Sequence, residues 1–511
     1  MTPLDWAVLA LYLASLLILA LYLRTRLRAD DDYFLGGRTI SAGALATSTI
    51  ATQCSTNSLL GAPAFVGFAA SGGLLWLQYE LALPLAMLAL TFLLVPARRL
   101  GIVSIYAFLE ARVGRGPRLL ASATFLLFRG VATGVTVYGA ALLLGILLDI
   151  DYTAAVLLLM AVTLAYDVLG GMRAVVASDV LQMVLIVVAV LVSIVMLAAQ
   201  GATPFAAEPA RLAALDFGWG MDGAAYEFWP MLIGGFFLYC AYYGCDQSQA
   251  QRLLAGRSEA DTRRILLYNG LLRFPLVLLY CLLGLALAAY ATGATAWLET
   301  LPTTASGAPN YNMVFPVYVL HAFPSGLTGL VMAGIFAAAM SSIDSALNAL
   351  SAVTLQDFRR NADAQAPLWL CRLTTLGWGA FAVAFSYQIE SIAPTVLEAI
   401  NKTGSLANGP LLALFVIALL MPGVGQKTAI AAYVVGFIAN LLCASLAPEI
   451  SWLWWNALGC VAAVAVAALM SGARAIGERE LIAGVWQRRG AATLLSAFAA
   501  MLAICWGFGV R

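Results

Sequence analysis

Long apolar runs constrain the fold of this chain more than any other feature. Stretches of roughly 20 residues with few charged side chains recur along its whole length, and each can cross a bilayer as an α-helix. The 511 residues are 62% hydrophobic and 10% charged, with a formal net charge of +1. We therefore expect an all-α, polytopic membrane protein embedded in a lipid bilayer. A soluble enzyme and a nucleic-acid-binding protein are both disfavoured.

The apolar runs predict about fourteen membrane-spanning helices. Their centres lie near positions 14, 54, 85, 132, 160, 187, 241, 278, 341, 379, 410, 436, 462 and 499. The first run lacks a basic n-region and a small-residue cleavage site, so we expect a retained span and not a signal peptide. We divide the chain into an extra N-terminal span (1–30), two halves (31–200 and 201–422) and C-terminal accessory spans (423–511).

The basic residues predict the orientation, because Lys and Arg collect in cytoplasmic loops. With the N-terminus outside, most of them fall in inner loops, Arg252 included. The exceptions are two outer residues and three within apparent spans: Arg211, Arg511, Arg129, Arg273 and Lys402. We expect a multi-pass protein of the cell inner or plasma membrane with both termini outside.

In this orientation the second and seventh spans run in opposite directions. Spans two to six and seven to eleven then form two five-helix halves of inverted topology. The leading span of each half has a polar, interrupted centre, at Ser48–Phe65 and Gly234–Gln247. A broken helix frees backbone groups at membrane depth, which is tolerated where they line a cavity for ions or substrate. For either segment taken alone, a kinked packing helix is the alternative.

The ninth span carries a polar face within Ala337–Ser351. Its members follow helical spacing: Ala338, Ser341, Ser342, Asp344, Ser345 and Asn348. A carboxylate at the bilayer centre costs about 2.5–3.5 kcal/mol on insertion scales, so it usually marks an ion or substrate path. Oxygen ligands of this kind suit a hard cation such as Na⁺. A helix-packing seam would explain the serines and alanines, but it does not need the carboxylate.

Several segments resemble, in order, a known family. They are Asp32–Arg38, Ser58–Phe65, Ser104–Gly114, Tyr166–Gln182, Tyr242–Arg252 and the serine stretch just described. The ordered set resembles the sodium:solute symporter family, which includes transporters of glucose, proline, iodide, sialic acid and vitamins, and it covers roughly residues 5 to 420. The resemblance implies a leucine-transporter-type fold with broken leading helices, and solute uptake coupled to the entry of Na⁺.

The resemblance also implies where Na⁺ binds. The site common to the family would use backbone carbonyls and two hydroxyls, from Ala51, Cys54, Ala338, Ser341 and Ser342. Some members, such as the sialic acid transporters, hold a second Na⁺, and the matching positions are Asp179, Ser341, Asp344 and Ser345. Asp344 stands where those relatives have a hydroxyl residue. It would either strengthen cation binding or carry a proton in place of the ion.

A substrate cavity is implied between the broken helices and their neighbours. The matching positions are Asn57, Ser58, Glu80, Tyr239, Tyr242, Arg273 and Asn401, and packing is the alternative for the two tyrosines. Arg129 is a further candidate, because a mid-span guanidinium needs a carboxylate. That carboxylate is either on the solute or internal, from Glu80, Asp344 or Glu398. The two buried arginines, Arg129 and Arg273, favour an organic anion or an amino acid as the solute. The sugar transporters of the family line this cavity with more amides and carboxylates, so a sugar is disfavoured.

We therefore expect a secondary active symporter that imports a small polar solute with Na⁺ by alternating access, and not an enzyme. The alternatives are a proton-coupled carrier that uses Asp344 and a sensor that binds solute without moving it. The chain ends a few residues after its last span, so no output domain is expected for a sensor. A membrane enzyme is disfavoured because no nucleophile, base and orienting group converge. The expected partners are the solute and the bilayer, with no required protein partner.

Overall fold

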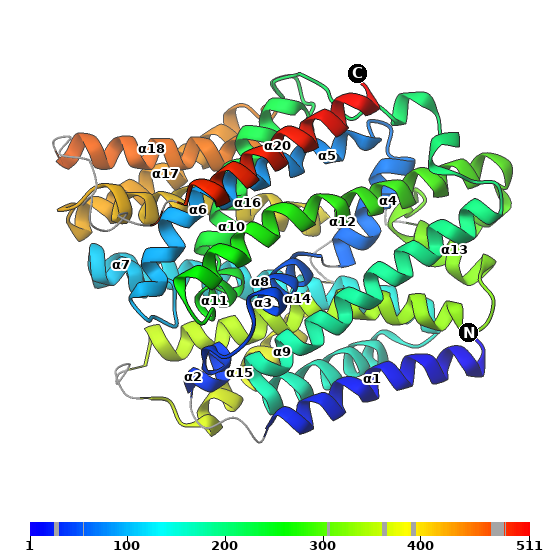
Figure 1. Ribbon diagram of the computed structural model, residues 1–511, viewed down its shortest axis with the longest axis horizontal. Helices are drawn as coiled ribbons and strands as arrows, with labels where there is room; N and C mark the ends of the chain where they lie inside the picture. The colour runs from blue at the N-terminus through cyan, green and yellow to red at the C-terminus, as the bar shows by residue number, and fades with distance from the viewer. Residues whose placement is uncertain are drawn as a thin grey trace.

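The structure is a computed structural model that describes residues 1–24, 30–54, 56–303, 307–359, 365–389, 395–471, 485 and 487–511. Figure 1 shows a bundle of long helices that run roughly along the same axis. Within these ranges every regular element is helical apart from two isolated β-bridges, which confirms the all-α prediction. Ten described helices are long and apolar enough to cross a membrane, and three shorter apolar segments accompany them. The chain is thus a polytopic membrane protein, as predicted.

The long helices are α1 (Pro3–Leu23), α6 (Ala82–Arg99), α8 (Arg115–Leu148), α9 (Tyr152–Ala199), α12 (Glu259–Gly293), α14 (Leu327–Asp357), α15 (Leu368–Ile389), α16 (Thr395–Leu420), α17 (Gln426–Leu446), α18 (Leu453–Ser471) and α20 (Arg488–Phe508). Shorter helices complete the bundle: α2 (Asp30–Leu35), α3 (Ala42–Gln53), α4 (Thr56–Phe68), α5 (Leu77–Glu80), α7 (Ala107–Arg112), α10 (Gly235–Cys245), α11 (Gln247–Leu254) and α13 (Val314–Ala322).

Helix α14 is the core of the bundle. Nearly all of its residues are buried, and it packs against α1, α3, α8, α9, α11 and α15. The outer helix α1 buries a single stripe instead, formed by Asp5, Leu9, Tyr12, Leu16 and Ala20. One buried stripe leaves the rest of an apolar helix for lipid, whereas a helix buried on all sides can carry polar groups that contact other protein groups. The polar face of the ninth span therefore lies inside the protein.

Both leading spans are broken, as predicted. The first break follows α3 at Cys54, whose φ of −82° and ψ of 61° are not helical, and α4 begins two residues later. The second lies at Asp246, which is extended (φ −82°, ψ 120°) between α10 and α11. A break leaves helix-end carbonyls and amides without helical partners, so each one supplies polar groups to the interior.

Helix α9 contains a third interruption, at Gly171. A continuous helix of its 48 residues would be about 72 Å long, more than twice the thickness of the hydrocarbon core. Gly171 takes φ 53° and ψ −152°, and a Cβ there would lie 2.7 Å from the carbonyl oxygen of Tyr33. The two spans expected near 160 and 187 are therefore parts of one interrupted helix. The total of fourteen spans, the inverted repeat and the four-part division of the chain stay predictions.

Candidate functional site

The polar face of α14 meets the last turn of α3. The hydroxyl of Ser341 lies 3.2 Å from the Ala51 carbonyl and 3.3 Å from that of Ala338. The hydroxyl of Ser342 donates to the carbonyl of Thr52 at 3.1 Å. Cys54 caps the same turn, with its amide directed to Ala51 and Ile50. An all-oxygen group of this kind suits a hard monovalent cation.

A buried ion pair from two other helices lies beside Ser345, one turn further along α14. Asp179 of α9 and Arg252 of α11 approach to 3.2 Å, and their side chains are 0% and 1% exposed. Ser48 of α3 accepts a hydrogen bond from the Arg252 Nε at 2.6 Å and donates to Asp179. Ser345 accepts another hydrogen bond from the same guanidinium. The prediction that Arg252 lies in a loop was wrong: it belongs to α11, a buried helix that packs against α3 and α14, and Asp179 compensates the buried charge.

Asp344 has partners of a different kind. It accepts a hydrogen bond from the hydroxyl of Tyr166 on α9, and Ser345 lies 3.1 Å from its other oxygen. Ser345 also contacts the Ser341 carbonyl at 2.6 Å and the Thr52 hydroxyl at 2.9 Å. The four residues expected at a second ion site, Asp179, Ser341, Asp344 and Ser345, are therefore neighbours, and a guanidinium lies among them.

Glu80 and Arg273 form a second buried ion pair. Their side chains are 0% and 6% exposed and approach to 3.1 Å, and the guanidinium also lies 3.7 Å from the Cys54 sulfur. Nearby, the ring of Tyr239 packs on that of Tyr79, with centroids 4.5 Å apart. The charges of Glu80 and Arg273 thus compensate one another within the protein.

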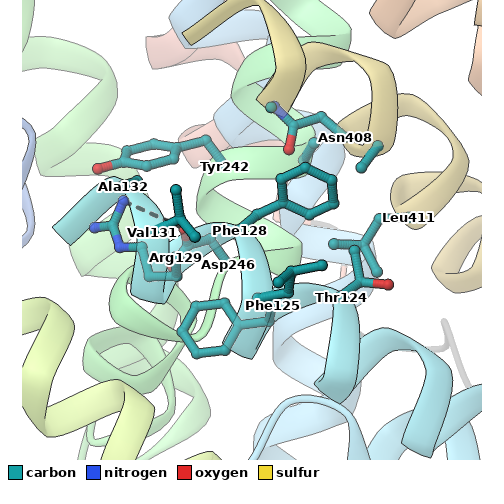
Figure 2. A pocket seen from close by; sticks show the side chains of 14 residues that line it. Thr124, Phe125, Phe128, Arg129, Val131, Ala132, Tyr242, Asp246, Asn408 and Leu411 are labelled. Atoms are coloured by element: carbon teal, nitrogen blue, oxygen red, sulfur yellow. Dashed lines mark ion pairs between the residues drawn. The ribbon is translucent and has the colours of Figure 1, made fainter. Parts of the chain in front are cut away.

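Arg129 and Tyr242 line a cavity of about 320 Å³. The cavity lies between α8, α10 and α16, and Asn408 faces it from α16 (Figure 2). Arg129 lies 3.6 Å from Asp246, donates to the Ser248 hydroxyl at 2.9 Å, and stands over the Tyr242 ring at 5.9 Å. Its side chain is 18% exposed, far more than those of Arg252 and Arg273. Of the two arginines expected at the substrate site, Arg129 is therefore the more exposed one, and it lines the cavity.

Of the other expected substrate positions whose side chains the structure describes, Ser58, Glu80, Tyr239 and Arg273 are not among the residues that line this cavity. The Ser58 hydroxyl contacts the Gln53 carbonyl at 3.3 Å, within the first break. The side chains of Asn57 and Asn401 lie outside the described residues, as does that of Glu398.

Sequence reasoning missed several functional candidates. Asp246, Ser248, Ser48 and Tyr166 were not singled out. The carboxylate paired with Arg129 is Asp246, which was not among the three internal partners considered. Asp246 lies at the end of the polar segment Gly234–Gln247, and this position is the sequence feature that could have identified it as a candidate.

Two broken helices beside a buried oxygen-lined core define a secondary transporter. Solved structures share this fold. A substrate-bound, outward-open Na⁺-coupled sialic acid symporter superimposes with a TM-score of 0.80 at 24% identity, covering 93% of this chain and 99% of that one. The nucleobase-cation symporter Mhp1 gives a TM-score of 0.52 at 12% identity over 89% and 96% of the two chains.

Residues 33–436 match the model of the sodium:solute symporter family, and the chain belongs to that family. It is 28% identical to sodium-coupled monocarboxylate transporter 1 of Xenopus laevis over 86% of this chain and 71% of that protein. It is also 28% identical to the sodium/sialic acid symporter NanT of Aliivibrio fischeri, over 91% and 92%. The protein is therefore a multi-pass, sodium-coupled symporter of a small solute, with Na⁺ as the coupling ion. This confirms the expected family, transport class and ion.

Proposed function

We propose that the solute is a small organic anion whose carboxylate binds Arg129. The observation that carries this proposal is the incomplete pairing of that side chain. Its nearest carboxylate oxygen is 3.6 Å away, and its Nε is buried without a hydrogen-bond partner among the described residues. A guanidinium can bind a carboxylate through two parallel hydrogen bonds, so a solute carboxylate offers Arg129 a better partner than Asp246 does.

The names of the relatives agree with an anionic solute. Monocarboxylates and sialic acid both carry a carboxylate, and transporters of each are 28% identical to this chain. The remaining cavity wall is mostly apolar, from Phe125, Phe128, Val131, Ala132 and Leu411. Such a wall suits a short carbon chain behind the charged group.

Binding at Arg129 would act directly on the second broken helix. Asp246 is the extended residue between α10 and α11, and its side chain caps α11 through the amide of Ser248 at 2.8 Å. A solute carboxylate on Arg129 would replace Asp246 as its ionic partner. Because discontinuous helices form the solute and ion sites of such transporters, this exchange would link solute binding to the helix break and so to the conformational equilibrium.

For the ion, we propose the group of Ala51, Cys54, Ala338, Ser341 and Ser342 as the sodium site. Support comes from the contacts of the two serine hydroxyls with the freed carbonyls of α3.

We further propose that the protein lies in the cell inner membrane or plasma membrane with its N-terminus on the outer side, and that it has no catalytic activity. The helix α7 leads into the start of α8, which is basic, and basic residues collect on the cytoplasmic side of a membrane. The N-terminus lies at the opposite end of the bundle from α2 and α7 (Figure 1), which supports its place on the outer side.

A thermal-shift screen tests the solute class. Purified protein is heated with short monocarboxylates, sialic acid, amino acids or glucose, in NaCl or in choline chloride. A ligand that binds only the folded state raises the melting temperature. We expect a carboxylate to stabilise the wild type in NaCl, and the shift to vanish in Arg129→Gln. The control is Arg264→Gln, since that side chain is 64% exposed and outside the cavity. Stabilisation by glucose that persists in Arg129→Gln would exclude the proposed anion site.

A further inference from the structure

Asn408 brings an unpaired amide to the cavity that Arg129 lines. It lies on α16, and its side chain faces the cavity at a place apart from Arg129 and Asp246 (Figure 2). Within the part of the chain that the structure describes, this amide has no hydrogen-bond partner. An amide group contains an acceptor oxygen and two N–H donors. Asn408 can therefore both donate to a bound solute and accept a hydrogen bond from it.

The other uncharged polar side chains of the cavity already have partners. The Thr124 hydroxyl donates to a backbone carbonyl of its own helix at 2.8 Å and lies 3.1 Å from the Tyr433 hydroxyl. The Tyr242 hydroxyl accepts a hydrogen bond from the Gln249 amide at 3.1 Å. Asn408 is thus the uncharged polar side chain of this cavity whose hydrogen-bonding groups are left for a solute.

Neighbouring helices fix the backbone that carries Asn408. Pro410 has no N–H group, so the carbonyl one turn earlier in α16 loses its helical partner and accepts a hydrogen bond from Asn440 of α17 at 2.9 Å. A Cβ at Gly409 would lie 2.4 Å from the Asn456 carbonyl oxygen, so α16 and α18 are in close contact here. Because α17 and α18 hold this part of α16, the amide faces the cavity from a defined position.

The cavity therefore has a charged polar group and a neutral one, with apolar side chains in the rest of its wall. An unsubstituted carboxylate bound to Arg129 would place carbon against the Asn408 amide, which would then lose its hydrogen bonds with water. A site with such a polar group disfavours a ligand that leaves it unpaired. A hydroxyl group is both donor and acceptor, so it can pair with either atom of the amide, whereas a carbonyl group can only accept.

We propose that the solute is a hydroxy acid whose hydroxyl lies at the end away from its carboxylate, and that Asn408 selects it by binding that hydroxyl. Arg129 binds the carboxylate, and the apolar wall contacts the carbon chain between the two groups. This inference rests on the proposed function, in which the solute carboxylate binds Arg129, and it adds the group that the far end of the solute must carry.

Calorimetric titration of the purified full chain in NaCl tests the proposal with matched pairs of acids. Each pair consists of propionate, butyrate, valerate or hexanoate and the same acid with a hydroxyl on its last carbon. We expect the wild type to bind the best-fitting hydroxy acid about tenfold more tightly than the unsubstituted acid of the same length. Arg129→Gln should lose binding of both acids.

Two substitutions of Asn408 test its part in this preference. Asn408→Leu has a similar volume but no hydrogen-bonding group, so the two acids of each pair should bind about equally. Asn408→Gln carries the same amide one methylene further into the cavity. The hydroxy acid that binds this variant best should therefore be one carbon shorter than the one that binds the wild type best.

Two results would overturn this inference and leave the anion site in place, provided that Arg129→Gln still loses both acids. One is equal binding of the two acids of every pair by the wild type; the other is an undiminished preference for the hydroxy acid in Asn408→Leu. If Asn408→Leu does not fold, an unchanged best length in Asn408→Gln would contradict the role of Asn408. Equal binding of carboxylates by the wild type and Arg129→Gln would instead exclude the anion site, and this inference with it.

Discussion

Arg129 of α8 and Arg252 of α11 share one partner, Ser248. Arg129 donates to the Ser248 hydroxyl at 2.9 Å, and Arg252 donates to its carbonyl at 2.6 Å. The first arginine lines the cavity that we propose for the solute, whereas the second is paired with Asp179 beside the polar face of α14. A displacement at the start of α11 therefore acts on both regions. Such a shared element is what coupling between two sites requires, because each site can then bias the same movement.

The first prediction concerns the shape of the Arg129 side chain. Arg129→Lys keeps the charge but replaces a two-pronged donor by a point charge, so the KM for a carboxylate solute should rise about tenfold or more. The measurement is uptake into proteoliposomes with an imposed Na⁺ gradient. Arg264→Lys, at an exposed position, is the control. Wild-type uptake together with wild-type stability in Arg129→Lys would show that Arg129 binds neither solute nor an essential internal partner.

The proposed sodium site predicts a change in ion dependence. Replacing Ser341 and Ser342 together by Ala removes two of five proposed oxygens, and losses of about 1 kcal/mol each raise the Na⁺ concentration for half-maximal uptake by tenfold or more. Ser351→Ala is a matched control, because this serine is buried on the same helix and contacts the Cys371 carbonyl. Unchanged sodium dependence in the double variant would remove these hydroxyls from the site.

The Asp344 side chain allows a test of whether transport is coupled to a proton as well as to Na⁺. We expect uptake to follow the Na⁺ gradient and to vary little across neutral pH, because the proposed sodium group at Ser341 and Ser342 consists of hydroxyl and carbonyl oxygens, which do not titrate there. Asp344→Asn should then retain sodium-driven uptake. The test imposes a Na⁺ gradient and, separately, a pH gradient on proteoliposomes. Uptake driven by the pH gradient in sodium-free buffer, and lost in Asp344→Asn, would identify a proton-coupled carrier instead.

The Glu80–Arg273 pair predicts a large effect on stability. Glu80→Gln leaves a guanidinium that is 6% exposed without a compensating charge, which costs about 3–5 kcal/mol. Glu259→Gln breaks the partly exposed pairs of this residue with Arg99 and Arg263 and should cost only about 0–1 kcal/mol per pair. Unfolding of the two purified variants in a denaturant series compares them. Equal stabilities would show that water or another group compensates Arg273.

The sequence by itself determined the class of the protein, the places where its two leading helices break, and the helix that carries the buried polar face. Apolar runs of membrane-spanning length require helices, and polar interruptions near Cys54 and before Gln247 mark where those helices break. The spacing along Ala337–Ser351 placed the hydroxyls and the carboxylate on one side of a helix that is indeed buried. These are local properties, because hydropathy, helical period and family motifs are read from neighbouring residues.

The pairing of the buried charges was decided only by the tertiary structure. Arg252 was counted with a cytoplasmic loop because it lies between the spans expected near 241 and 278, yet it belongs to the buried helix α11 and meets Asp179, 73 positions away. Arg129 likewise meets Asp246, 117 positions along the chain, whereas the acids considered from the sequence were Glu80, Asp344 and Glu398. Burial makes an unpaired charge costly but does not specify its partner. That choice depends on which helices pack together, and no local pattern encodes it.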